Sequence, residues 1–281
     1  MRFPFRGRPL IGVVHLEALP GAPRARLGVD AILRLALRDA ASWVRGGADG
    51  LIFENFGDAP FAPERVEPHV PAILAVAARE AVARFRLPVG INVLRNDARS
   101  AMAAALASGA SFIRVNVHTG AMETDQGILE GRADETLRIR RALGAKVAIF
   151  ADVYVKHAAP LFRGSPARAA SDAVHRGHAD ALLVTGDATG GEADPARLAE
   201  VKRAAPRTPV LVASGVTPDN ADAFAEADGF IVGTYAKRGG RIDVVRVRKL
   251  VKATRRSRGR PRRPGGPWRA CGTSRPAGGG R

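Results

Sequence analysis

The amino-acid sequence predicts an α/β fold, a (β/α)8 barrel of the TIM type that carries a disordered basic tail at its C-terminus. Apolar runs of strand length recur eight times along the chain, and each is followed by a segment with helical spacing. Strict alternation of strands and helices requires a parallel sheet with right-handed crossovers. Eight such units in roughly 250 residues match the closed barrel.

The predicted strands are short runs of Val, Ile, Leu, Ala and Phe. Hydrophobic residues make up 46% of the chain and aromatic residues only 5%, so aliphatic side chains must fill the core. Strands of a parallel sheet are buried on both faces and therefore read as continuous apolar runs. The eight runs are residues 10–14, 50–53, 89–93, 112–115, 147–151, 181–184, 210–213 and 229–232.

The predicted helices are Ala- and Arg-rich segments that alternate with these runs. Asp194 and Thr217 each stand before a proline, which is typical of a capping residue followed by the first helical position. Glycines that suit C-terminal caps follow four segments, at Gly46, Gly109, Gly144 and Gly177. The helices are expected at residues 30–45, 63–84, 97–108, 134–143, 167–176, 195–204, 218–225 and 243–254.

A doubly wound sheet is the alternative arrangement of such units. It would usually show a G-x-G-x-x-G turn after its first strand. Here the first run is followed by H-L-E-A-L-P-G at residues 15–21, and no G-x-x-x-x-G-K-[ST] loop occurs in the sequence. The barrel is therefore the preferred fold.

The chain divides into a barrel domain, residues 1–254, and an Arg-, Gly- and Pro-rich tail, residues 255–281. The tail holds nine arginines and no acid, so the net charge of +17 falls to +8 without it. A segment with almost nothing apolar to bury gains little from ordering. Residues 258–261, R-G-R-P, match the core of a minor-groove-binding motif, but this match arises easily in such a composition, so nucleic acid is not an expected partner.

Composition also bears on location and cofactors. No run reaches the roughly 18 apolar residues that a membrane span needs, and no signal-peptide segment follows the basic start. We therefore expect a cytoplasmic protein. The single Cys271 excludes an internal disulfide bond and gives no metal cluster, so neither a metal nor another cofactor is expected.

Active sites of such barrels lie at the C-terminal ends of the strands. Glu54 and Asp152 directly follow buried runs, so each carboxylate must be hydrated, paired or bound to a ligand. We expect both to be catalytic, one giving a proton and the other taking it, with Lys156 beside them lowering the pKa of one. The alternative is that they pair with Arg95 or Lys156 and only seal the barrel end.

The connection after the fourth run is long, roughly fifteen residues against a typical four to six. It carries His118, the alternative catalytic acid, which would arrive with loop closure. Polar residues at other strand ends are expected to bind substrate, although each could be polar merely because it meets water. They are His15, Asn92, Asn116, Thr185 and Asp187.

Glycine turns follow the last two predicted strands. Loops at these places commonly hold phosphate through backbone N–H groups, and glycine lets the anion approach. Lys237 and Arg238 would add positive charge. The alternative is that the glycines only make tight turns. The expected phosphate-binding residues are Ser214, Gly215, Gly233 and Thr234.

Ordered motifs across about residues 8–252 resemble the BtpA/SgcQ family. They include I-G-V-V-H-L at 11–16, G-L-I-F-E-N-F at 50–56, G-I-N-V-L-R-N-D at 90–97, I-R-V-N-V-H at 113–118, A-D-V-Y-V-K-H at 151–157, V-T-G at 184–186 and V-A-S-G-V-T at 212–217. The resemblance implies a TIM-type barrel related to phosphate-binding barrels. The family is named after a cyanobacterial factor for photosystem I biogenesis that associates peripherally with thylakoids, and other members in sugar-utilisation operons are named as nucleosidases.

Two functions follow from these observations. The first is an enzyme that acts by acid/base chemistry on a small phosphorylated metabolite, a nucleoside or sugar phosphate, as a nucleosidase-like hydrolase, a lyase or an isomerase. The second, implied only by the resemblance, is a photosystem I type assembly factor without catalysis and with peripheral membrane association. No segment shows the amphipathic, aromatic-faced helix of a peripheral anchor. A homo-oligomer is compatible with both functions.

Overall fold

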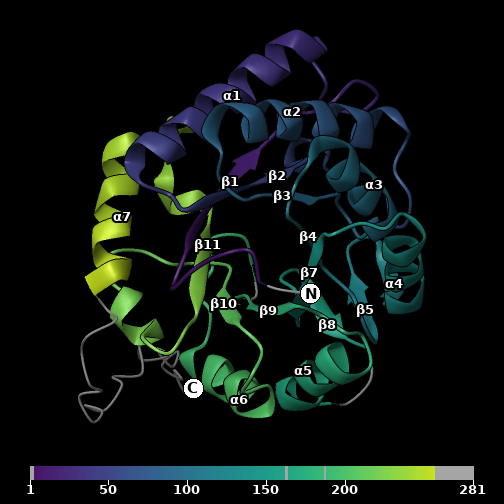
Figure 1. The fold of residues 1–281 in the computed structure, drawn as a ribbon, viewed down its shortest axis with the longest axis vertical. Coiled ribbons are helices and arrows are strands. Elements are labelled where there is room, and N and C mark those ends of the chain that lie inside the picture. Colours follow the sequence, from purple (N-terminus) through teal and green to yellow (C-terminus); the bar gives the residue numbers. More distant parts are fainter. Residues whose placement is uncertain (1–2, 162–163, 187, 257–281) are drawn as a thin grey trace, which may run out of the picture.

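The computed structural model describes residues 3–161, 164–186 and 188–256. Its main strands are β1 (Leu10–His15), β2 (Gly50–Glu54), β3 (Val89–Asn92), β4 (Phe112–Val115), β7 (Ala148–Val153), β9 (Ala181–Val184), β10 (Val210–Val212) and β11 (Gly229–Val232). All eight pair in parallel and close into a barrel in the order β1-β2-β3-β4-β7-β9-β10-β11 (Figure 1). The predicted TIM-type barrel is confirmed.

Helices form the outer layer of the barrel (Figure 1). Asp194 accepts a hydrogen bond from the Ala196 amide at 2.8 Å and precedes Pro195, as the sequence predicts for a helix start. Gly47 and Gly109 end two helices in the left-handed conformation. The helices are α1 (Val29–Gly46), α2 (His69–Phe85), α3 (Ala98–Ser108), α4 (Ala133–Ala142), α5 (Pro166–His175), α6 (Pro195–Ala204) and α7 (Val244–Arg256).

Two predicted helices differ from those observed. The second begins at His69 rather than at residue 63, because Pro68 has no N–H to donate within a helix. The predicted helix 218–225 is only a 3-10 turn, η2 (Ala221–Phe224). There the side chains of Thr217 and Asn220 bond each other's backbone amides and compete with helical hydrogen bonding.

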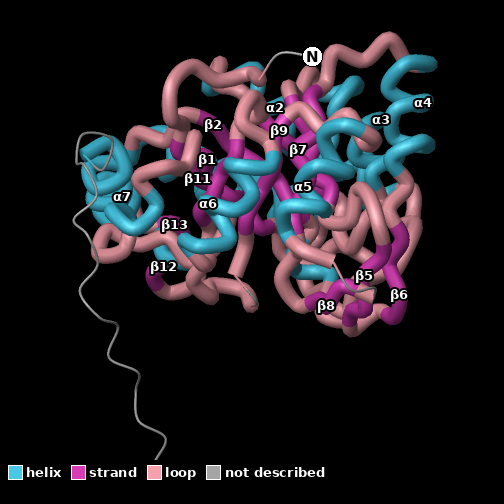
Figure 2. Tube along the Cα trace, turned by 90° about the horizontal axis from the view of Figure 1, so that it is seen from below, coloured by secondary structure: helices cyan, strands magenta, loops and turns pink. Residues whose placement is uncertain are grey.

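Two small antiparallel sheets stand at the end of the barrel opposite the N-terminal segment (Figure 2). The long connection after β4 folds into a hairpin of β5 (Ala121–Thr124) and β6 (Gly127–Glu130), to which β8 (Ala158–Pro160) is added. The second sheet pairs β12 (Lys237–Arg238) with β13 (Arg241–Ile242). The sequence analysis predicts a long connection but not these strands.

Side chains alternate between the inside of the barrel and the layer under the helices. Inside, the rings of Phe112 and Phe150 stack with centroids 4.4 Å apart, and Phe3 and Phe5 pack against this apolar group. Gly90 makes room for Phe112, because a Cβ there would lie 2.2 Å from its ring. The same alternation brings polar side chains inward toward the strands' C-terminal ends, namely Glu54, Asn92, Arg114, Asn116 and Asp152.

Helix α7 continues through Arg256, two residues beyond its predicted end. Arg255 pairs with Asp49, Nη2 to Oδ1, at 3.2 Å. The rest of the predicted tail, residues 257–281, lies outside the described residues. Within the described part of the chain, no helix combines the length and the apolar character that crossing a membrane requires.

Candidate functional site

Arg114 lies at the centre of the polar group inside the barrel mouth. Its Nε and Nη2 donate to Oδ1 and Oδ2 of Asp152, each at 3.0 Å, and its Nη1 donates to Oε1 of Glu54 at 3.3 Å. Burial alone would lower the pKa of Arg114, but the two carboxylates outweigh it and raise that pKa. One guanidinium therefore holds both of the acids that the sequence places at the mouth.

Asp152 is enclosed by this pairing. Its carboxylate is 0% exposed, and Oδ2 also accepts from Nδ2 of Asn116 at 2.8 Å. Both oxygens are thus occupied by Arg114 and Asn116. Asp152 lies beside the other predicted residues. Its contacts hold the Arg114 guanidinium in position.

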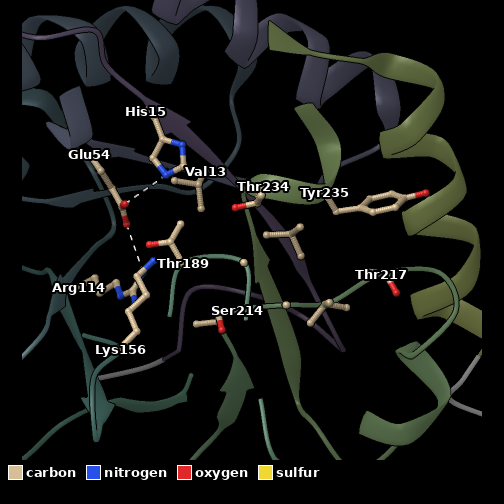
Figure 3. Close-up of a pocket in the computed structure, with 16 residues that line it drawn as sticks. Val13, His15, Glu54, Arg114, Lys156, Thr189, Ser214, Thr217, Thr234 and Tyr235 are labelled. Carbon is tan, nitrogen blue, oxygen red and sulfur yellow. Dashed lines mark hydrogen bonds and ion pairs between the residues drawn. The ribbon is translucent and has the colours of Figure 1, made fainter. Parts of the chain in front are cut away.

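Glu54 contacts Arg114 on one side and lines a cavity on the other. Its Oε1 accepts from Arg114 and from Nδ2 of Asn92 at 3.2 Å, while Oε2 lies 3.7 Å from Nε2 of His15 (Figure 3). Burial would raise the pKa of Glu54, but Arg114, His15 and Lys156 together lower it. Glu54 is therefore held in its ionised form.

His15 is held as a neutral ring between Lys237 and Glu54. Nζ of Lys237 lies 2.6 Å from Nδ1 of His15, and an ammonium can only donate, so Nδ1 is the acceptor and Nε2 carries the proton. Burial lowers the pKa of His15 to about 3, Glu54 opposes this change and Lys237 adds to it. The Nε2 proton is directed toward Glu54.

Lys156 follows β7 and lies close to Glu54 and Arg114 (Figure 3). Its neighbours Tyr154 and His157 have φ of 58° and 57°, a conformation that non-glycine residues rarely adopt. Arg95 donates from Nη2 to the carbonyl oxygen of Lys156 at 2.7 Å. Burial and the charge of Arg114 lower the pKa of Lys156.

These side chains form one wall of a cavity of about 190 Å³, called here the mouth cavity. The opposite wall is made by the loops after β10 and β11, which hold Gly215 and Gly233 (Figure 3). Within the described residues, the amides of Gly215 and Val216 donate no hydrogen bond. An anion in the mouth cavity would therefore meet free N–H donors on one side and cationic side chains on the other.

A second cavity, of about 330 Å³, adjoins the mouth cavity and is called here the side cavity. It is lined by Phe56, Phe61 and Arg95, among others. Both cavities are lined by Glu54, Arg114, Lys156 and Thr189. Glu54, Arg114 and Lys156 thus lie where the two cavities meet. A ligand that occupies both cavities would pass beside these side chains.

Two predicted site residues, His118 and Thr185, do not join the polar group around Arg114. His118 is buried and lines neither cavity, and its Nε2 is 2.8 Å from the carbonyl oxygen of Gly177. Thr185 donates to the carbonyl oxygen of Tyr154 at 3.1 Å. Asp187 lies outside the described residues.

The residues predicted to bind phosphate differ in whether their polar groups are free to contact a ligand. Ser214 lines the mouth cavity, but its hydroxyl accepts from the Gly186 amide at 2.8 Å and donates to the Gly191 carbonyl oxygen at 2.6 Å. That hydroxyl therefore holds the loop after β9 in place. Thr234 and Gly233 line the cavity beside His15.

Arg114 is a central residue of this group that was not among the site residues expected from the sequence. It occupies the third position of the apolar run F-I-R-V. An ion inside a buried strand requires a partner of opposite charge, and that signal was present in the sequence.

The chain is similar in sequence to known proteins over most of its length. A family model described as the BtpA family matches residues 6–256. The photosystem I biogenesis protein BtpA of Synechocystis sp. is 45% identical over 250 residues, which cover 87% of this chain and 87% of that protein. A protein of Pyrococcus horikoshii is 44% identical over 253 residues, which cover 88% of this chain and 96% of that protein.

Among solved structures, thiamine phosphate pyrophosphorylase from Pyrococcus furiosus matches with a TM-score of 0.58 and 15% identity, over 89% of this chain and 97% of that one. N-(5'-phosphoribosyl)anthranilate isomerase from the same organism matches with a TM-score of 0.56 and 15% identity, over 89% and 99% of the two chains. At this level of identity the likeness shows the fold alone.

Proposed function

The chain belongs to the BtpA family, and we propose that it is an enzyme acting on a small phosphorylated metabolite bound in the mouth cavity. One observation carries the proposal. A carboxylate with a lowered pKa, Glu54, and a buried lysine, Lys156, face the unbonded amides of Gly215 and Val216 across the same small cavity.

The phosphate group is assigned to the wall formed by the loops after β10 and β11. Free amides at Gly215 and Val216 can donate to phosphate oxygens, and the Arg114 guanidinium supplies positive charge opposite them. The two solved barrels described above are named for phosphorylated compounds. Because they share only the fold with this chain, the assignment rests on the cavity itself.

The reaction is assigned to acid/base chemistry in which Glu54 accepts a proton. Its Oε2 is free of the Arg114 contact, and the lowered pKa keeps it ionised at neutral pH. Asp152 acts through Arg114 and is a positioning residue rather than a group that touches substrate. The side cavity accommodates the part of the substrate that extends away from its phosphate.

Thermal stability with inorganic phosphate and with sugar phosphates tests the site. A ligand that binds only the folded chain raises the melting temperature by mass action. Gly233→Ala should diminish this rise, since a Cβ there lies 3.0 Å from Cε1 of His15, inside the group that lines the cavity. Gly28→Ala is the control, because nothing lies within 4 Å of its Cβ.

Gly215 is unsuitable for this test. A Cβ there would lie 2.3 Å from the carbonyl oxygen of Gly191, so a substitution would disturb folding as well as binding. If no phosphate compound raises the melting temperature, or if Gly233→Ala responds as the unsubstituted chain does, the phosphate site is not in the mouth cavity.

The second candidate function is assembly of a membrane complex, favoured by the 45% identity to the Synechocystis biogenesis protein. A Synechocystis strain that lacks its own BtpA separates the two functions. If this chain restores photosystem I and Glu54→Gln restores it equally well, assembly does not need the proposed chemistry. If only the unsubstituted chain restores it, the activity at Glu54 is required.

A further inference from the structure

Lys156 stands at the junction of the mouth cavity and the side cavity, and its side chain lines both. Within the described residues, its amine makes no hydrogen bond and no ion pair within 4 Å. The two nearby acids pair with Arg114 instead, Asp152 through both of its oxygens and Glu54 through Oε1. A lysine whose role was to neutralise these carboxylates would be paired with them, so the free amine needs another explanation.

The electrostatic surroundings favour the neutral form of this amine. Burial and the positive charge of Arg114 lower the pKa of Lys156, while Glu54 and Asp152 oppose the change. At neutral pH the amine of Lys156 is therefore uncharged in a larger fraction of the molecules than the amine of an exposed lysine is. Only the uncharged amine is a nucleophile.

The backbone around Lys156 is fixed from both sides. Arg95 binds its carbonyl oxygen at 2.7 Å. His157 Nε2 accepts from the Thr189 amide at 3.0 Å, which ties the loop after β7 to the loop after β9. Tyr154, which like His157 has a left-handed backbone, accepts from the Thr185 hydroxyl at 3.1 Å through its carbonyl oxygen. The loop that carries the amine is thus bonded to the segments after β3 and β9, and such contacts favour a defined position of the amine.

We propose that Nζ of Lys156 forms a Schiff base with the carbonyl carbon of a phosphorylated aldehyde or ketone. This inference rests on the phosphate site of the proposed function, which would place the carbonyl between the two cavities. It narrows the substrate to a compound that carries both a phosphate and a reactive carbonyl.

The step balances without an oxidant or a metal. The uncharged amine adds to the carbonyl carbon, the carbonyl oxygen takes up a proton, and the nitrogen gives one up. The resulting hydroxyl takes a second proton from solvent and leaves as water while the nitrogen lone pair forms the C=N bond. The product is a protonated imine, and the ionised Glu54 can then remove a proton from the adjacent carbon.

Reductive trapping tests the Schiff base. The full chain is incubated with dihydroxyacetone phosphate or ribose 5-phosphate and sodium cyanoborohydride, and the products are measured by intact mass and by peptide mapping. We expect one adduct per chain, located on Lys156. Lys156→Arg should remove it, and Lys249→Arg, which changes an exposed lysine, should leave it unchanged. Peptide mapping of the unsubstituted chain identifies the lysine even if Lys156→Arg fails to fold.

The outcomes separate the Schiff base from the phosphate site. If phosphate raises the melting temperature but no carbonyl compound modifies Lys156, the Schiff base is wrong and the phosphate site stands. An adduct spread over exposed lysines also overturns the proposal. If dihydroxyacetone modifies Lys156 as fast as its phosphate does, the Schiff base stands and the phosphate anchor is wrong. If neither binding nor an adduct is found, both are wrong.

Discussion

Arg114 donates to both carboxylate oxygens of Asp152, from Nε and Nη2 at 3.0 Å each, inside the barrel. The two side chains are 2% and 0% exposed, so water cannot replace either partner. The same guanidinium reaches Glu54 at 3.3 Å with its remaining nitrogen. The two acids therefore share one cation but are bound to it unequally, and their substitutions should differ.

Asp152→Asn should destabilise the chain more than Glu54→Gln does. The asparagine removes the charge that faces two nitrogens of a buried guanidinium, and breaking a buried pair costs about 3–5 kcal/mol. Glu54→Gln leaves the Asp152 pair intact, so the loss should be clearly smaller. Urea unfolding at neutral pH measures both variants. Equal losses would show that the two acids contribute alike to holding Arg114.

Glu54→Gln should bind ligand but lose turnover. Removing a group that accepts a proton in the reaction lowers kcat by roughly 10²–10⁴-fold, while an isosteric amide changes KM little. Asp152→Asn should also lose turnover, because it frees Arg114 to move away from the cavity. Steady-state kinetics with a phosphorylated compound that the chain turns over provide the test. A near-normal rate in Glu54→Gln would refute the catalytic assignment of Glu54, and a near-normal rate in Asp152→Asn would refute the positioning role of Asp152.

Truncation after Thr254 should destabilise the chain relative to truncation after Arg256. The shorter form loses Arg255, which binds Oδ1 of Asp49 at 3.2 Å and the carbonyl oxygen of Gly47 at 3.3 Å. Exposed pairs of this kind contribute about 0.2–1 kcal/mol. Differential scanning calorimetry of the two truncated forms measures the difference, and Asp49→Asn should reduce it. Identical melting temperatures would show that the Arg255 contacts do not stabilise the fold.

The barrel could be predicted from the sequence because each unit repeats the same local signal. A short apolar run is followed by a helix with a recognisable start, as at Asp194, or a recognisable end, as at Gly109. Strand position then points to the mouth, where the structure places Glu54, Asp152 and Lys156 around Arg114. These features depend on local sequence and on the order of elements.

The rest of the site depends on contacts between distant segments. The arginine in the F-I-R-V run indicates that a partner of opposite charge is needed, but its partners are known only once the acids of β2 and β7 lie on either side of Arg114. His118 contacts the carbonyl oxygen of Gly177, and the connection that follows it forms the hairpin of β5 and β6; no local pattern predicts either feature. The Ser214 hydroxyl is occupied by the loop after β9, so a residue suited to phosphate binding supports another loop instead.

The free energy of unfolding should depend on the ionisation of His15. Burial lowers its pKa from 6.5 to about 3 in the folded chain, with a contribution from Lys237. Between these two pKa values the unfolded chain binds more protons than the folded chain. The contribution of His15 to the free energy of unfolding is therefore fully present above about pH 6.5 and decreases as the pH is lowered. At pH 5 the loss from this group should be about 2 kcal/mol, at about 1.4 kcal/mol per pH unit.

His15→Gln removes the ionisable ring, and the glutamine amide reaches the position of Nε2, where its NH2 group can still face Glu54. Urea unfolding at pH 7.5 and at pH 5 gives the free energy of each variant at each pH. The unsubstituted chain should lose about 2 kcal/mol more than His15→Gln on acidification. His175→Gln, which changes an exposed histidine, should behave like the unsubstituted chain. If His15→Gln loses as much stability on acidification as the unsubstituted chain, His15 does not stay neutral in the folded protein.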